Sequence, residues 1–284
     1  MKPDERRGLW LAALAVLCFS TSPVLLIWAN PLSPYEKTAW RMAVAALAVL
    51  ALALVQRRPP LYHRRDGGKL LLFGLVTAVH FLAYIASLNF TSIAHALTVT
   101  YTAPVFVTLF SAWFLKESIA RRKYLGVAVV IAGTGILAGF EPALTRRMLI
   151  GDGLALISAI AFGFYSVMGR SQRTAYPLLT YAFALYGVAA LWLLPAALAT
   201  FTPSGYGLRQ VLSLIAVGII PMAIGHTLYN AAVRRAHATY ANLIATQEVT
   251  GGVILGALLL GQVPTVSSLV GAAVTLAGIA LVLI

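Results

Sequence analysis

The chain has 284 residues, of which 60% are hydrophobic and 10% charged, and its mean hydropathy is +0.87. This composition lies far outside that of water-soluble domains and excludes a soluble globule. The formal net charge of +13 would suit a nucleic-acid binder. Because the basic residues form short clusters between apolar stretches, orientation in a membrane explains them better, and no nucleic-acid partner is expected.

Ten apolar stretches follow one another along the chain, each near the length of about 20 residues that a membrane-spanning helix needs. They are rich in Ala, Leu and Val and lack the alternating pattern of barrel strands, so they predict helices. We therefore expect an all-α integral membrane protein surrounded by lipid. The predicted spans are Leu9–Asn30, Tyr35–Gln56, Lys69–Phe90, His95–Leu115, Tyr124–Phe140, Asp152–Arg170, Leu178–Thr200, Leu208–Val233, Thr239–Gly261 and Thr265–Ile284.

Basic residues are distributed unequally between the two sides of these spans. If the N-terminus lies inside, 16 of the 21 Lys and Arg residues fall on the inner side. Inner loops of membrane proteins carry such an excess, which predicts a bacterial-type inner membrane with both termini in the cytoplasm. The outer side then holds Lys37, Arg41, Arg146, Arg147 and Arg209.

The sequence contains an internal repeat. An offset of 145 residues aligns the block Gly126–Gly133 with Gly271–Gly278 at five of eight positions, and it also pairs Tyr84 with Tyr229. A constant offset predicts a duplication into residues 1–145 and 146–284. Because each half has five spans, the second half is inverted in the membrane, which favours a binding site between the halves that opens alternately to each side.

Several motifs resemble those of the drug/metabolite transporter superfamily, in its EamA-like branch. They are Trp40-Arg41 at the start of the second span, Ala-Pro104 in the fourth, Lys116-Glu117 at its inner end, and the two Gly-x-Ala-Val-x-x-Ala-Gly blocks. The second half departs from this pattern, with Val249 at the position of Pro104 and Gly261-Gln262 at that of Lys116-Glu117. The resemblance implies two five-helix repeats and export of amino acids or similar small metabolites, aromatic and hydrophobic amino acids first.

Polar side chains inside the spans are candidate site residues because they are costly in hydrocarbon. The third span carries His80 and Tyr84, with Phe81 beside them, and the eighth carries His226, Tyr229 and Asn230. Helical spacing puts the polar groups of each span on one face. Hydrogen bonding between helices is the alternative role, but the near-equivalent placement in both halves predicts a shared central cavity.

The ninth span contains Gln247 and Glu248, the latter being the one carboxyl group deep inside an apolar stretch. Glu248 could bind a substrate ammonium, carry a proton, or pair with a buried histidine or with Arg41. Arg41 lies near the outer end of its span, where snorkelling to the interface or structural pairing is the favoured interpretation. The alternative is a gate or a contact with a substrate carboxylate.

Aromatic, proline and glycine residues add further candidates. The mid-span rings of Tyr101, Phe164 and Tyr165, with Phe81 and Tyr84, either pack the bundle or wall a cavity.

Pro104 and Pro221 interrupt their spans as hinges or for packing. Close helix approach, within the chain or between protomers of a homodimer, is predicted at Gly126, Gly133, Gly135, Gly139, Gly271 and Gly278.

These candidates favour a secondary transporter of a small-molecule substrate. The eight acidic residues are too few and scattered for a multi-carboxylate metal centre, and no Gly-x-x-x-x-Gly-Lys motif occurs, so neither metal, cofactor nor ATP is expected. A membrane-embedded enzyme acting on lipid-like substrates should show paired carboxylates or a Ser/His/Asp set. A channel should repeat a ring of charge around a pore.

Overall fold

Apolar helices make up the fold. The computed structural model describes residues 3–91, 93–121, 123–138, 145–261 and 266–283, which contain helices and no strand. Seven helical segments are long and apolar enough to cross a membrane, and three shorter apolar segments, Ala103–Leu115, Lys123–Ile136 and Leu269–Val282, bring the crossings to ten. The expected all-α membrane fold is thereby confirmed.

The described elements run in two sets of five crossings. The first set comprises α1 (Pro3–Phe19) with α2 (Ser22–Trp28), α3 (Pro34–Val55), α4 (Gly67–Ser87), α5 (Ile93–Thr100) with α6 (Ala103–Phe110) and the π-helical η2 (Ser111–Leu115), and α7 (Lys123–Ala138). The second comprises α8 (Arg146–Ser171), α9 (Leu178–Ala199), α10 (Leu208–Val217) with the π-helical η4 (Gly218–His226) and α11 (Thr227–Arg235), α12 (Ala238–Ala245) with α13 (Glu248–Leu260), and α14 (Val266–Leu283). Short 3₁₀ turns, η1 (Arg64–Asp66) and η3 (Pro203–Gly205), lie in connections.

Four of the ten crossings are interrupted. Pro104 lies in the first turn of α6, and Pro221 lies inside η4. Each proline lacks the N–H that a continuous α-helix would use, so both expected interruptions are present, whereas a role as hinges stays a prediction. The breaks between α1 and α2 and between α12 and α13 were not predicted.

The breaks in the fourth and ninth crossings are repeats of one another. Around the first break, the N–H groups of Tyr101 and Thr102 donate to the carbonyls of Leu97 and Val99. With every residue shifted by 145 positions, the same two bonds occur around the second break, from Thr246 and Gln247 to Asn242 and Ile244. Both crossings then end on a left-handed residue at equivalent positions, Lys116 (φ 57°) and Gly261 (φ 68°). The duplication seen in the sequence therefore extends to backbone detail.

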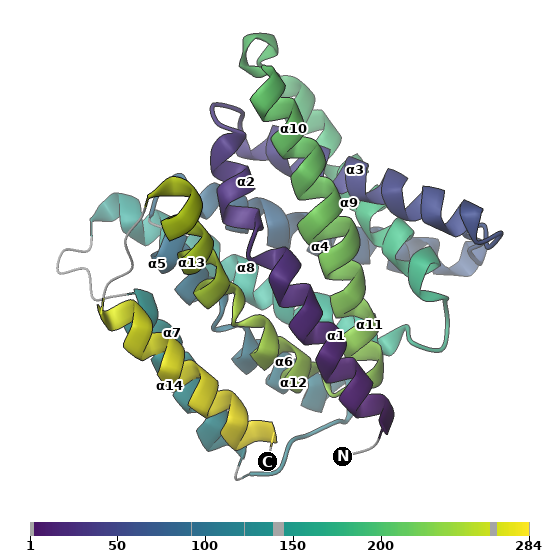
Figure 1. Cartoon of the computed structure of the whole chain (residues 1–284). Helices are drawn as coiled ribbons and strands as arrows, with labels where there is room; N and C mark the ends of the chain where they lie inside the picture. The colour runs from purple at the N-terminus through teal and green to yellow at the C-terminus, as the bar shows by residue number, and fades with distance from the viewer. Residues whose placement is uncertain (1–2, 92, 122, 139–144, 262–265, 284) are drawn as a thin grey trace.

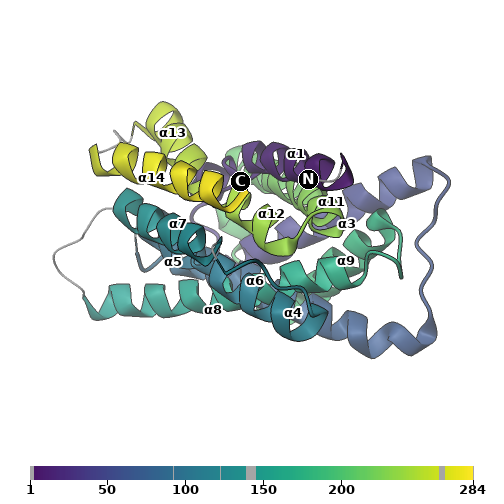
Figure 2. The ribbon, with the colours of Figure 1, turned by 90° about the horizontal axis from the view of Figure 1, so that it is seen from below.

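Two helices from opposite halves, α7 and α14, pack side by side in both views (Figures 1 and 2). A Cβ atom added to Gly133 would come within 2.5 Å of the backbone nitrogen of Thr275, and one added to Gly278 within 2.6 Å of that of Val130. The offset of 145 residues relates Gly133 to Gly278 and Val130 to Thr275. The two helices therefore make the same glycine contact in both directions. These glycines pack within the chain; Gly139 lies outside the described residues.

The other crossings enclose the centre of the bundle. Helix α3 packs along α9 and helix α4 along α8, and both pairs join the two halves. The two ends of the chain lie at the same end of the bundle (Figure 1). The breaks at Tyr101 and Glu248 are buried, so the freed backbone there is surrounded by protein rather than by lipid.

We predict that replacing Gly133 by Ala destabilises the protein, because one methyl group would enter occupied space between α7 and α14. Overpacking of this kind costs about 1–3 kcal/mol, which lowers the melting temperature in detergent by several degrees. Gly135 is the matched control, since a Cβ there meets nothing within 4 Å. Equal melting temperatures for Gly133→Ala and Gly135→Ala would contradict the packing described.

Candidate functional site

The two repeat-related breaks meet at the centre of the bundle. Tyr101 lies in the break between α5 and α6, and Glu248 is the first residue of α13, directly after the other break. The Tyr101 hydroxyl donates a hydrogen bond to the Glu248 carboxylate. This bond joins the two halves at the point where both helices are interrupted.

A small cavity lined by buried residues lies beside this bond. Its volume is about 20 Å³, roughly the room that one water molecule requires. Six different crossings supply its walls, which are therefore shared between the two halves. The lining residues are Arg41, His80, Phe81, Tyr84, Leu97, Thr100, Tyr101, Phe162, His226 and Glu248.

Aromatic rings fill most of the space around the cavity. The His80 ring stacks on Phe162 at 4.7 Å between centroids, and the His226 ring meets Phe81 edge-on at 4.7 Å. The Nδ1 atom of His80 is anchored on Ser158, 2.9 Å from its Oγ and 3.0 Å from its carbonyl oxygen. The walls of the cavity are thus flat, apolar faces held in fixed orientations.

Arg41 points into this centre instead of to the membrane interface. Its side chain is only 2% exposed, and its guanidinium carbon lies 4.6 Å from the centroid of the Phe81 ring. One of its terminal nitrogens donates to Ser22 Oγ at 3.0 Å. The interpretation as a snorkelling arginine was therefore wrong: helices around α3 bury this position, and the cation rests on an aromatic face.

Arg41 and Glu248 line the same cavity without forming an ion pair within 4 Å. Three buried polar atoms here also have no hydrogen-bond partner among the described residues: Nε of Arg41, the hydroxyl of Tyr84 and Nδ1 of His226. Buried polar groups are normally paired because an unpaired one costs about 1–3 kcal/mol. The cavity therefore offers donors, acceptors and opposite charge to a bound solute.

A polar layer follows the cavity toward the end of the bundle where the chain termini lie. Tyr229, one turn beyond His226, lies 2.7 Å from Ser166 Oγ and accepts a hydrogen bond from Asn242 at 3.1 Å. Asn230 donates to the Tyr165 hydroxyl at 2.7 Å. These groups are bonded to one another, although the side-chain oxygens of Asn230 and Asn242 have no partner among the described residues. They do not line the cavity and form its floor.

Five predicted substrate-binding residues do not line the cavity: Tyr165, Tyr229 and Asn230 belong to the polar layer, and Phe164 and Gln247 lie apart from both. Phe164 stacks on Phe110, with 4.0 Å between ring centroids, and faces away from the cavity. Gln247 is only partly buried, and its side chain accepts a bond from Thr250. The α8 ring that lines the cavity is Phe162. It lies three residues before Tyr165 and therefore on the same helix face. Phe164, the residue next to Tyr165, is rotated from it by about 100° around the helix axis.

Sequence patterns also missed small polar partners of the site. Ser22, Ser158 and Ser166 hold Arg41, His80 and Tyr229, respectively. Serine is common in membrane helices, and nothing in its spacing singles these residues out. A signal did exist for Phe162, because its i, i+3 spacing to Tyr165 places it on a face already chosen as a candidate.

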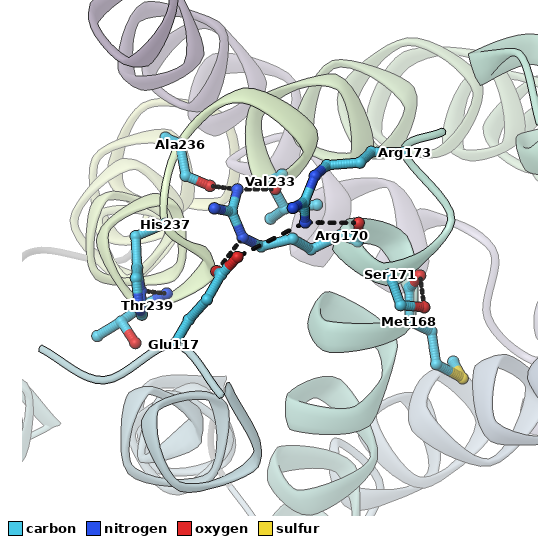
Figure 3. Close-up of polar contacts among 9 residues, drawn as sticks. All are labelled: Glu117, Met168, Arg170, Ser171, Arg173, Val233, Ala236, His237 and Thr239. Atoms are coloured by element: carbon cyan, nitrogen blue, oxygen red, sulfur yellow. Dashed lines mark hydrogen bonds and ion pairs between the residues drawn. The ribbon is translucent and has the colours of Figure 1, made fainter. Parts of the chain in front are cut away.

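A second polar cluster occupies the end of the bundle that carries the termini (Figure 3). Arg170, on the last turns of α8, donates through Nε to the carboxylate of Glu117 and through one terminal nitrogen to the carbonyls of Val233 and Ala236, at 3.0 and 2.6 Å. Arg173 lies 3.6 Å from the same carboxylate. A polar pocket of about 880 Å³ opens beside these groups.

His237 lines the same pocket, and its surroundings favour the neutral ring. Burial lowers the pKa of His237, and the nearby Arg170 charge acts in the same direction. A neutral ring agrees with the observed geometry, in which His237 Nδ1 accepts a hydrogen bond from the Thr239 N–H at 3.2 Å. The positive charge of this cluster therefore comes from the arginines and not from the histidine.

Comparison with known proteins agrees with the geometry. A sequence model of the EamA-like transporter family matches the chain twice, over residues 6–139 and 149–284. A solved crystal structure superposes with a TM-score of 0.82 at 20% identity, covering 96% of this chain and 95% of the other. That likeness shows the fold alone.

Two curated relatives carry functional names. The probable terminal-alkyne amino-acid exporter of Streptantibioticus cattleyicolor is 27% identical over 291 residues, covering 97% of this chain and 93% of the relative. The pseudopaline exporter CntI of Pseudomonas aeruginosa (strain UCBPP-PA14) is 26% identical over 218 residues, covering 76% of this chain and 75% of the relative. Both relatives are named as exporters.

We predict that Tyr229→Phe destabilises the protein, because Ser166 and Asn242 would lose a buried partner. The cost of leaving such groups unpaired is about 1–3 kcal/mol, which should appear as a lower melting temperature in detergent. Tyr181→Phe is the matched control: this ring is equally buried, but its hydroxyl has no hydrogen-bond partner among the described residues. If both changes had the same effect, the polar floor would not be a stabilising network.

Proposed function

The chain belongs to the EamA-like transporter family, and on that premise we propose that it exports amino acids from the cytoplasm by alternating access. Aromatic and hydrophobic amino acids are the favoured substrates. The protein is a multi-pass membrane transporter, and the proposal adds its substrate class, direction and mechanism.

One observation carries the substrate class: Arg41 and Glu248 line a single cavity without neutralising each other. A zwitterionic amino acid presents a carboxylate that suits the guanidinium and an ammonium that suits the carboxyl group of Glu248. Glu248 stays near the Tyr101 hydroxyl, which fixes its orientation. In hydrocarbon neither charge is tolerated without such partners, so a bound zwitterion would satisfy both.

The remaining walls suit an apolar side chain. Phe81, Phe162 and the imidazole faces of His80 and His226 surround the cavity with flat rings. Such rings favour aromatic or branched aliphatic groups. Two relatives are named as exporters of a terminal-alkyne amino acid and of pseudopaline, which agrees with export of amino-acid-like solutes.

The small volume of the cavity supports alternating access over a channel. At about 20 Å³ the cavity is far too small for an amino acid, so binding requires the surrounding helices to move apart. Breaks in the fourth and ninth crossings provide places for such movement, and their equivalence in the two halves allows either end to open. A channel would need an open path past this point.

The proposed orientation puts the termini in the cytoplasm and the protein in an inner membrane. Both ends of the chain lie at one end of the bundle (Figure 1), and with that end inside, 16 of the 21 basic residues fall on the inner side. Large exposed side chains such as Leu17, Leu47 and Leu258 then face lipid.

We predict that Phe162→Leu raises the concentration of phenylalanine needed for half-maximal uptake into proteoliposomes about threefold to tenfold. That range corresponds to losing a ring–ring contact of about 0.5–1.5 kcal/mol. Phe164→Leu, two residues away on another face of α8, should leave this concentration unchanged. The cavity would be misplaced if the two variants behaved alike.

We predict that Glu248→Gln lowers phenylalanine uptake at least tenfold, because a charge-assisted hydrogen bond to the substrate ammonium is lost. Glu5→Gln, at the inner end of the bundle, is the control and should transport normally. A competition panel of amino acids against labelled phenylalanine tests the substrate class in the same assay.

An imposed pH gradient separates the two functional roles of Glu248. If the residue carries a proton, Glu248→Gln should retain uptake without a gradient and lose only the response to the gradient. Normal uptake by the variant under both conditions would show that Glu248 merely ties α13 to Tyr101.

A further inference from the structure

Two arginines hold the inner ends of α8 and α11 together reciprocally. Arg170 of α8 donates to the carbonyls of Val233 and Ala236 at the end of α11. Arg234 of α11 donates to the carbonyls of Gln172 and Tyr176, just beyond the end of α8, at 2.9 and 2.6 Å. Each cation thus binds carbonyls at or just beyond the C-terminal end of the other helix, where positive charge is favourable.

Glu117 joins the first half of the chain to these two helix ends. It follows η2 at the inner end of the fourth crossing, and its backbone N–H donates to the Ser111 carbonyl at 3.1 Å. Its carboxylate bonds to Arg170 and lies 3.6 Å from Arg173. Figure 3 shows Arg170 between Glu117 and the two carbonyls of the α11 end. The carboxylate therefore links the first half of the chain to the joined ends of α8 and α11.

A polar pocket at this end of the bundle lies beside the linkage. Glu117, Arg170 and His237 line its wall. The pair is only partly exposed, at 14% for the Arg170 side chain and 24% for Glu117. Because the pair is partly shielded from water, its attraction stabilises the contact between the two halves more than a fully exposed ion pair would.

The equivalent positions at the outer end carry no charge. With the repeat offset of 145, Leu25 corresponds to Arg170 and Gln262 to Glu117. Leu25 lines a mainly apolar pocket with Ala216 and Leu259, and Arg209 lines it as well; Gln262 lies outside the described residues. The inverted repeat is therefore asymmetric at the place where its two ends must close.

We propose that Glu117 and Arg170 form an inner latch, which holds the cytoplasmic end shut and makes the inner-closed form the resting state. This inference rests on alternating access as the proposed function. Opening inward must separate Glu117 from Arg170, while Arg170 keeps its carbonyl partners on α11. Opening outward separates the surfaces at Leu25, where the described residues form no ion pair. Inward opening therefore costs more free energy than outward opening, and the states in which the inner end is shut are favoured.

A cysteine inside the cavity reports which end is open. Thr100→Cys in a Cys18→Ala background puts one thiol on the cavity wall. A membrane-impermeant thiol reagent is then applied to right-side-out and to inverted membrane vesicles, and the ratio of the two labelling rates is measured. Uptake of labelled phenylalanine is followed in parallel for each protein.

Glu117→Gln should raise the ratio of inner-side to outer-side labelling rates about tenfold. A change of this size is expected when one charge-assisted hydrogen bond is lost. Glu117→Asp, which keeps the charge but shortens the reach, should shift the ratio in the same direction by less. Asp4→Asn is the matched control at the same end, because Asp4 and Arg235 form an exposed pair 3.5 Å apart. It should leave the ratio unchanged.

An unchanged ratio in both Glu117 variants, with normal phenylalanine uptake, would overturn the latch and leave the proposed function standing. A shift of similar size in Asp4→Asn would also overturn it, because any lost charge would then suffice. If no variant or parent protein took up phenylalanine and the thiol reacted from one side only, alternating access itself would fail, and the latch with it.

Discussion

A backbone surrounded by hydrocarbon must satisfy its own hydrogen-bonding groups, and this constraint determines where the site lies. An unbroken helix meets the requirement alone, but the paired helices α5/α6 and α12/α13 do not. Their breaks can exist only where other protein groups surround them. Since the two breaks occupy the same repeat position, the pseudo-symmetry brings them together at the centre, where Tyr101 and Glu248 join them. The candidate site therefore lies where two breaks 145 residues apart in the sequence meet.

The same constraint explains how the closed form can be stable yet ready to open. The polar atoms of Arg41, Tyr84 and His226 that face the cavity lack partners among the described residues, a cost that a bound solute would relieve. Around them, aromatic rings provide rigid packing. A solute that supplies the missing partners gains free energy that can offset the separation of one end of the bundle.

Local patterns in the sequence predicted the crossings and much of the centre. Ten apolar stretches indicated the helices, and the i, i+4 spacing of His80 and Tyr84 indicated a shared face, because both features depend only on regular helical geometry. Other features depend on tertiary neighbours. The ninth crossing breaks without a proline at the break, Arg41 turns inward because neighbouring helices cover it, and Phe162 rather than Phe164 meets the cavity because of how α8 is rotated in the bundle.

Counterflow in proteoliposomes containing the wild-type protein tests alternating access most directly. Vesicles are loaded with unlabelled phenylalanine and diluted into a trace of labelled phenylalanine, without any ion gradient. A carrier whose single site faces one side at a time should accumulate the label transiently above its external concentration, and only when the lumen is preloaded. Equilibration of the label to the external concentration, at a rate independent of preloading, would show an open pore and contradict alternating access.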